Sequence, residues 1–159
     1  MISVAEASGG FSALTRMYKR LVNEFIGQLP LQPQSFPLAP TDNAFEQGMC
    51  ADTTYVVKGG MLGMRCQDRK LFTWDEGDMI LPDAGSDDVT YYAESAVLLA
   101  AYPTVRLVEA VLADEQLARL WTRILTMQQA MLVRLLAAYV PEESHTTPGF
   151  AYFEPGDVI

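Results

Sequence analysis

Apolar residues recur at helical spacing near the N-terminus of the chain and then give way to the alternation of short strands. Between residues 12 and 29 they lie three and four positions apart, which predicts an amphipathic helix that starts at Ser12 and is ended by Gly27 and Pro30. The stretch 31–40 is rich in proline and cannot continue a helix. We therefore expect an extended connector or an edge strand there.

Short segments with the composition of β-strands follow, separated by turn residues. Gly59-Gly60 predicts a hairpin, and Gly77-Asp78 predicts a tight turn that delivers the chain into a buried strand. Such closely spaced strands predict an antiparallel sandwich or barrel. The predicted strands are residues 55–58, 61–66, 71–74, 79–81, 89–92 and 96–102.

The pattern changes after Pro103, where good helix formers dominate up to residue 139. Asp114 is a suitable N-cap and divides this stretch into a short helix and a long one. Apolar residues cover more than one stripe of the long helix, either because it packs on the strands alone or because it also contacts a second subunit. We expect a homodimer, and the candidate interface residues are Leu117, Trp121, Ile124, Met131 and Leu135.

The residues around the Gly-Asp turn are repeated in altered form at the end of the chain. Residues 73–80 and 152–159 both contain an aromatic residue, an acid or proline, Gly-Asp and two apolar residues, in that order. The repeat indicates that a second unit begins there. We therefore expect three parts: a helical segment over 1–35, a strand-rich domain with C-terminal helices over 36–141, and a linker with the start of a similar domain over 142–159.

The formal net charge of −9 argues against two classes of binding partner. Nucleic acids and anionic membranes attract clusters of Lys and Arg, so we expect neither as a partner of this segment. No apolar stretch is long enough to cross a bilayer and no signal peptide is visible. The two cysteines do not form a disulfide framework, which also favours a cytoplasmic location.

The order of these parts resembles that of cyclic-nucleotide-binding domains, the family of the catabolite activator protein and of protein kinase A regulatory subunits. Phe45-Glu46-Gln47-Gly48, residues 54–62 and residues 72–78 carry the resemblance. It implies a mainly β fold, an antiparallel β-roll (a double-stranded β-helix, jelly-roll-like) with an N-terminal helix and a C-terminal helix pair. It also implies a regulatory role, and in this family the long helix commonly forms the subunit contact.

The segment that binds the cyclic phosphate in this family differs here. In the family a Gly-Glu pair and an Arg follow the Gly-Asp turn, whereas this chain has no Arg or Lys between Lys70 and Arg106. Aspartates occupy the loop instead, and they would repel a phosphate that no cation neutralises. We therefore expect cyclic nucleotide binding to be altered or lost. The candidate pocket residues are Trp74, Asp83, Asp87, Asp88 and Tyr91.

Other functions stay open beside that of a non-catalytic regulatory module in a larger signalling or transcription-regulating protein. The domain could sense a small molecule, although the simpler interpretation of Trp74 and Tyr91 is that they belong to the core. A metal enzyme of the cupin kind has a similar strand pattern but uses several histidines, and the only histidine here is His145, in the predicted linker. We expect no cofactor and no catalysis.

Overall fold

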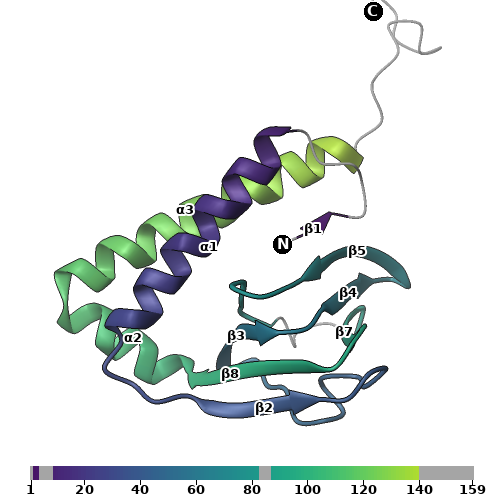
Figure 1. Cartoon of the computed structure of the whole chain (residues 1–159), viewed down its shortest axis with the longest axis horizontal. Helices are drawn as coiled ribbons and strands as arrows, with labels where there is room; N and C mark the ends of the chain where they lie inside the picture. Colours follow the sequence, from purple (N-terminus) through teal and green to yellow (C-terminus); the bar gives the residue numbers. More distant parts are fainter. Residues whose placement is uncertain (1, 4–8, 83–86, 140–159) are drawn as a thin grey trace, which may run out of the picture.

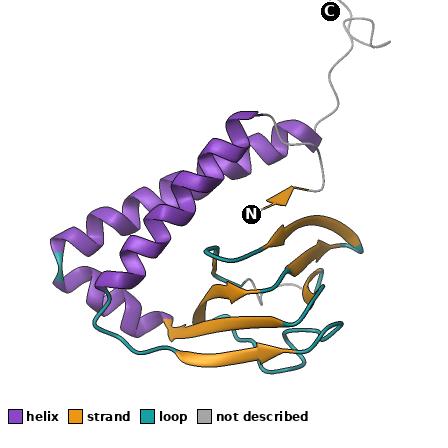
Figure 2. Cartoon of the chain, viewed as in Figure 1, coloured by secondary structure: helices purple, strands orange, loops and turns teal. Residues whose placement is uncertain are grey.

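The computed structural model of this protein describes residues 2–3, 9–82 and 87–139. A β-roll forms one half of the molecule, and two long helices lie along one side of it (Figure 1, Figure 2). The fold class predicted from the sequence is confirmed. The helices are α1 Gly9–Gln28, α2 Thr104–Ala113 and α3 Glu115–Tyr139, and the strands are β1 Ile2–Ser3, β2 Gln34–Leu38, β3 Thr53–Gly59, β4 Leu62–Cys66, β5 Arg69–Trp74, β6 Met79–Ile80, β7 Val89–Ala93 and β8 Val97–Pro103.

The roll consists of two antiparallel four-stranded sheets, with the strand orders β1-β5-β4-β7 and β2-β8-β3-β6. All the predicted strands are present, and the proline-rich stretch supplies β2, an edge strand that pairs with β8. Pro37 is tolerated there because an edge strand has one side free of ladder hydrogen bonds. The core between the sheets includes Tyr55, Val57, Leu62, Phe72, Trp74, Tyr91 and Leu99.

The Gly59-Gly60 pair makes a corner between the two sheets, so the predicted hairpin is wrong. β3 pairs with β6 and β8, whereas β4 pairs with β5 and β7. Gly60 has φ +83°, and a Cβ atom on it would lie 2.0 Å from the carbonyl oxygen of Ala96. Hairpins and corners both need a sharp change of direction that glycine permits, and the local sequence does not say which strand becomes the partner.

Helix α1 begins at Gly9, earlier than the predicted start at Ser12. Gly9 and Gly10 are poor helix formers, but in the first turn they destabilise the helix little, because the N–H groups there have no intrahelical acceptor. Helix α3 begins after Asp114, as predicted. The Oδ1 atom of Asp114 accepts hydrogen bonds from the backbone N–H groups of Gln116 at 2.8 Å and of Leu117 at 3.3 Å.

Helices α1 and α3 run antiparallel beside each other (Figure 1). The ring centroids of Phe25 and Trp121 lie 5.4 Å apart. Two helical turns from this contact along both helices, Gln128 donates a hydrogen bond to the Tyr18 hydroxyl. These contacts therefore belong to one continuous seam. Helix α2 contacts both α3 and β8 and connects the helix pair to the roll.

The C-terminal repeat over 152–159, the expected linker and second domain over 142–159, and His145 lie outside the described residues. The division of the chain into three parts stays a prediction. Among the described helices, none is long and apolar enough to cross a membrane.

Candidate functional site

The Gly-Asp turn joins β5 to β6 in the way that the sequence predicts. Gly77 has φ +92°, and its N–H donates to the carbonyl oxygen of Val57 at 2.9 Å. The Asp78 carboxylate accepts a hydrogen bond from the Asp75 N–H at 2.9 Å. Asp78 is completely buried, and this burial raises the pKa of its carboxyl from 3.8 to about 6. The turn thus places a titratable group inside the molecule.

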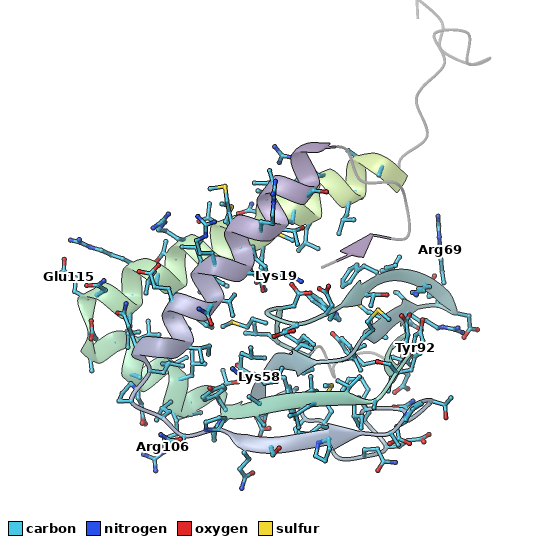
Figure 3. All side chains as sticks on the ribbon, in the orientation of Figure 1. Lys19, Lys58, Arg69, Tyr92, Arg106 and Glu115 are labelled. Atoms are coloured by element: carbon cyan, nitrogen blue, oxygen red, sulfur yellow. The ribbon has the colours of Figure 1, made fainter. Side chains whose placement is uncertain are left out.

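An ion pair connects α1 to this turn. The Lys19 ammonium contacts Oδ1 of Asp75, and Figure 3 shows Lys19 between α1 and the roll. Burial alone would raise the pKa of Asp75, but the hydrogen bond from Lys19 opposes it and the pKa is lowered. Helix α1 is therefore held to the roll by a charged contact as well as by apolar packing.

Strand β6 is an edge strand, and α1 and α3 cover its free side. The Tyr18 hydroxyl donates to the Met79 carbonyl oxygen and accepts from the Met79 N–H, both at 3.2 Å. Nε2 of Gln128 donates to the Tyr18 hydroxyl at 2.7 Å and to the Met79 carbonyl oxygen at 3.3 Å. We call these groups, the Tyr18 hydroxyl, the Met79 backbone and the Gln128 amide, the edge network. It replaces the neighbouring strand that β6 lacks on this side.

The two aromatic pocket candidates lie in the core of the roll. Trp74 is 7% exposed and Tyr91 is 3% exposed. Trp74 packs edge-to-face on Phe72 with ring centroids 4.7 Å apart, and Tyr91 packs similarly on Phe45 at 5.5 Å. This packing supports the simpler interpretation that both are core residues. The indole Nε1 of Trp74 is buried, and no residue of the described segments accepts a hydrogen bond from it.

The described aspartate candidates differ from the aromatic ones in burial. Asp87 and Asp88 are exposed, and Asp83 lies outside the described residues. The carbonyl oxygen of Asp88 accepts a hydrogen bond from the Gln67 N–H at 2.9 Å, which attaches the end of the loop to the β4–β5 turn. Within residues 9–82 and 87–139, no Lys or Arg forms an ion pair with Asp87 or Asp88.

The outer face of the β4–β7 pair carries a polar cluster that sequence reasoning missed. The Arg65 guanidinium lies 4.7 Å from the centre of the Tyr92 ring, and the Tyr92 hydroxyl donates to Glu94 at 3.2 Å. Lys70 pairs with Glu94 and lowers the pKa of that carboxyl against the effect of its burial. An open hollow of about 630 Å³ adjoins the cluster. Strand alternation predicts only that these side chains point outward, so it gave no signal for the cluster.

The long helix α3 has a buried row and an exposed row of apolar side chains. Four of the five predicted interface residues, Leu117, Ile124, Met131 and Leu135, are buried inside the subunit, which corrects their proposed location at a subunit surface. Trp121, the fifth, is partly buried against Phe25. We define the outer row as Leu125, Leu132 and Leu136, which are 40%, 47% and 64% exposed.

The fold is similar to that of several solved regulators. The N-terminal domain of a transcriptional regulator from Streptomyces coelicolor matches with a TM-score of 0.52 and 19% identity over 69% of this chain and 85% of that domain. The c-di-GMP responsive global regulator CLP from Xanthomonas campestris matches with a TM-score of 0.53 and 16% identity, over 75% of this chain and 59% of CLP. Oxidised CprK in complex with o-chlorophenolacetic acid matches with a TM-score of 0.51 and 12% identity, over 77% of this chain and 50% of CprK.

The match thus spans 59% of the length of CLP and 50% of that of CprK. No protein-family model and no curated protein matches the sequence. At these levels of identity, the likeness establishes the fold alone.

Proposed function

We propose that this chain, which has the fold of cyclic-nucleotide-binding-like regulatory domains, is a non-catalytic interaction module that forms a homodimer within a larger signalling or transcription-regulating protein. The outer row of α3 carries this proposal. The buried row packs within the core of the subunit, where α3 contacts α1. The outer row lies outside the buried core and exposes leucines to water.

The spacing of the outer row suits a second copy of the same helix. Leu125, Leu132 and Leu136 are seven and four residues apart, and Gln129 fills the position between the first two. Leucines at this spacing form the seam of a two-stranded coiled coil, and a polar residue in such a seam sets the register. Full burial of an exposed leucine stabilises a contact by about 1.5–3 kcal/mol. The outer-row leucines are already partly covered within the subunit, so each contributes less than this to a dimer. Since association itself is costly, we expect a dimer that depends on protein concentration.

Sedimentation equilibrium of the chain tests this proposal. We expect the wild-type mass to rise toward that of a dimer as concentration increases, and Leu132→Asp to stay monomeric because a carboxylate would be buried in the seam. Val108→Asp is the matched control, since Val108 is similarly exposed but lies on α2. A wild-type chain that remains monomeric, or a Val108→Asp variant that dissociates equally, would contradict the proposed contact.

We also propose that cyclic nucleotide binding is altered or lost. Trp74 and Tyr91 are buried in the core, and Asp87 and Asp88 are exposed without a paired cation in the described segments. A phosphate close to these carboxylates would meet uncompensated like charge. Both features support a domain that no longer depends on a cyclic nucleotide.

A small-molecule sensor is the second candidate. The buried Trp74 Nε1 supports it, because a ligand carbonyl or ether oxygen could accept its unused hydrogen bond. CLP is described as responsive to c-di-GMP and CprK was solved with o-chlorophenolacetic acid, so proteins of this fold take chemically different ligands. A thermal-shift screen against metabolites tests this function: a ligand should raise the melting temperature of the wild type but not of Trp74→Phe.

A cupin-type metal enzyme is the third candidate, and no feature of the described residues supports it. In the described part of the chain, no three His, Cys, Asp or Glu side chains lie close enough together to hold a metal ion. Elemental analysis of the purified full chain would test this alternative, since a cupin-type enzyme should retain a stoichiometric metal.

A further inference from the structure

The outer face of the β4–β7 pair is hollowed beside the polar cluster, and a glycine forms the floor of that cluster. Gly63 on β4 pairs with Thr73 on β5 and with Tyr92 on β7. A Cβ atom on Gly63 would lie 2.4 Å from the Tyr92 ring and 2.7 Å from Oε1 of Glu94. Both side chains therefore lie directly over the Gly63 backbone, in the space that a larger residue would fill.

The Glu94 carboxylate at the centre of the cluster is already bonded within the chain. It pairs with the Lys70 ammonium, and it accepts hydrogen bonds from the Thr73 and Tyr92 hydroxyls, each at 3.2 Å. Because Lys70 offsets its charge, Glu94 fixes the position of the Tyr92 ring without adding net charge to the hollow.

Arg65 supplies a cation that the described chain leaves unpaired. Its guanidinium lies over the Tyr92 ring, 4.7 Å from the ring centre, and Arg65 lines the hollow. No carboxylate within residues 9–82 and 87–139 forms an ion pair with it. A guanidinium that lies over a ring keeps N–H groups at its edge, where they can donate in pairs to a carboxylate.

Asp68 supplies an anion in the same hollow. It lies in the turn between β4 and β5 with φ +60°, a conformation that Asp adopts more readily than most residues. Asp68 is exposed, and no Lys or Arg of the described segments pairs with it. Arg65 and Asp68 thus line one hollow without pairing with each other. The hollow therefore offers a separate contact for each sign of charge.

One wall of the hollow is fixed by hydrogen bonds to β7. The Thr41 N–H donates to the Ala93 carbonyl oxygen at 2.8 Å, although the φ of Thr41 is +74°, a costly value for a β-branched residue. Asn43 is oriented by its Oδ1 atom, which accepts from the Phe45 N–H at 3.0 Å. Its Nδ2 atom donates to no residue of the described segments and is left as a donor for a ligand. The hollow, of about 630 Å³, is large enough for a small molecule.

We propose that this hollow binds a small zwitterion, a free amino acid, whose carboxylate contacts Arg65 and whose ammonium faces Asp68. The region holds two cationic and two anionic side chains, Arg65, Lys70, Asp68 and Glu94. A simple anion would be attracted by Arg65 but repelled by Asp68, and a simple cation would meet the reverse. A ligand that carries both charges gains both attractions.

The amino acid site is separate from the two functions proposed above. Trp74 is buried in the core, whereas Arg65 and Asp68 are exposed on the outer face of the roll. The outer row of α3 does not line the hollow. Binding of the amino acid therefore requires neither a ligand at Trp74 nor a second subunit.

Isothermal titration calorimetry of the full chain tests the inference, with each of the standard amino acids at millimolar concentration as the probe. We expect at least one of them to bind the wild type. Arg65→Gln should weaken that binding at least about tenfold, because hydrogen bonds to a charged group are lost. No binding of any amino acid to the wild type, or equal binding by wild type and Arg65→Gln, would overturn the inference.

Arg106→Gln is the matched control. Arg106 is also exposed but lies on α2, and Figure 3 shows it on the other side of the molecule from Tyr92. This variant should bind the amino acid as the wild type does. If it loses as much affinity as Arg65→Gln, a general effect of positive charge explains the binding and the site at Arg65 is wrong.

Asp68→Asn tests the position of the ammonium. It should weaken binding of the amino acid by about threefold or more, since one attraction between opposite charges is lost. The corresponding acid without the amino group should bind Asp68→Asn at least as well as it binds the wild type. A change of affinity that is the same for both compounds, zero included, would overturn the assignment of the ammonium to Asp68.

An NMR titration of the wild type gives a measurement that needs no variant. The side-chain amide of Asn43 and the ring of Tyr92 should shift as the amino acid is added, because both line the hollow. Shifts at the Trp74 indole without shifts at these two groups would place the ligand in the core and overturn the inference.

Failure of the dimer and failure of the amino acid site give different results. Leu132→Asp, which removes the proposed subunit contact, should bind the amino acid as the wild type does. A monomeric chain that binds it contradicts the proposed dimer and supports this site. A dimeric chain that binds no amino acid supports the dimer and overturns the site.

Discussion

The hydroxyl of Tyr18 bonds both backbone groups of Met79, a residue 61 positions later in the chain. A single side-chain oxygen on α1 therefore completes the hydrogen bonding of β6 where its sheet ends. The Gln128 amide, from α3, donates to the Tyr18 hydroxyl and to the Met79 carbonyl oxygen. The helix pair and the roll consequently form one unit, connected at a buried polar point.

Tyr18→Phe should destabilise the chain by about 1–3 kcal/mol, because the Met79 N–H would lose its acceptor in a buried site. Urea denaturation followed by circular dichroism measures this loss. Tyr92→Phe is the matched control: its hydroxyl bonds to Glu94 at the surface of the roll, so we expect a much smaller change. Equal losses in the two variants would show that the edge network adds nothing beyond an ordinary tyrosine hydrogen bond.

Asp78 should make the chain less stable as the pH rises. Its folded-state pKa of about 6 lies above the ordinary 3.8, so the folded state binds the proton more tightly. This contribution is fully present below about pH 3.8 and is lost as the pH rises through about 6. A shift of this size corresponds to roughly 3 kcal/mol.

Asp78→Asn isolates this effect, since the amide oxygen can still accept from the Asp75 N–H. Between pH 5 and pH 8 the unfolding free energy of the wild type should fall relative to that of the variant. Asp75 and Glu94, whose pKa values are lowered, act in the opposite sense and only at more acidic pH. Parallel pH profiles of wild type and variant would rule out a buried, titrating Asp78.

Gly60→Ala should cost more than about 1 kcal/mol, because the new methyl group would clash with the Ala96 carbonyl at a positive φ. Gly59→Ala is its neighbour and its control, since nothing lies within 4 Å of a Cβ atom there and its φ is not positive. Thermal unfolding of the two variants measures the difference. Similar melting temperatures would mean that the corner between β3 and β4 is not as tight as described.

Local signals in the sequence predict where turns, helix caps and strands lie, but they do not predict which strands pair with one another. Gly77-Asp78, Asp114 and the proline-rich edge strand each act through neighbouring backbone atoms, so the sequence predicts them correctly. Gly59-Gly60 marks a change of direction, but the choice between a hairpin and a corner depends on strands far along the chain. The burial of the pocket candidates is likewise decided by distant strands: the aromatic members Trp74 and Tyr91 are buried, whereas Asp87 and Asp88 are exposed.

Periodicity also failed to separate the two faces of α3. Ile124 and Leu125 are adjacent in sequence, and each belongs to a row with heptad spacing. Which row turns inward is decided by the position of α1, which is fixed by contacts such as that between Phe25 and Trp121. The edge network was missed for a related reason, because Tyr18, Met79 and Gln128 meet only in the folded chain.

Calorimetric titration of the full chain with cyclic AMP and with cyclic GMP tests directly whether cyclic nucleotide binding is altered or lost. We expect no saturable heat of binding at micromolar nucleotide, and no change in sedimenting mass, because the aromatic core and the exposed aspartates offer a phosphate no counter-charge. Stoichiometric binding of either nucleotide with micromolar affinity would contradict this expectation and would show that the domain binds cyclic nucleotides.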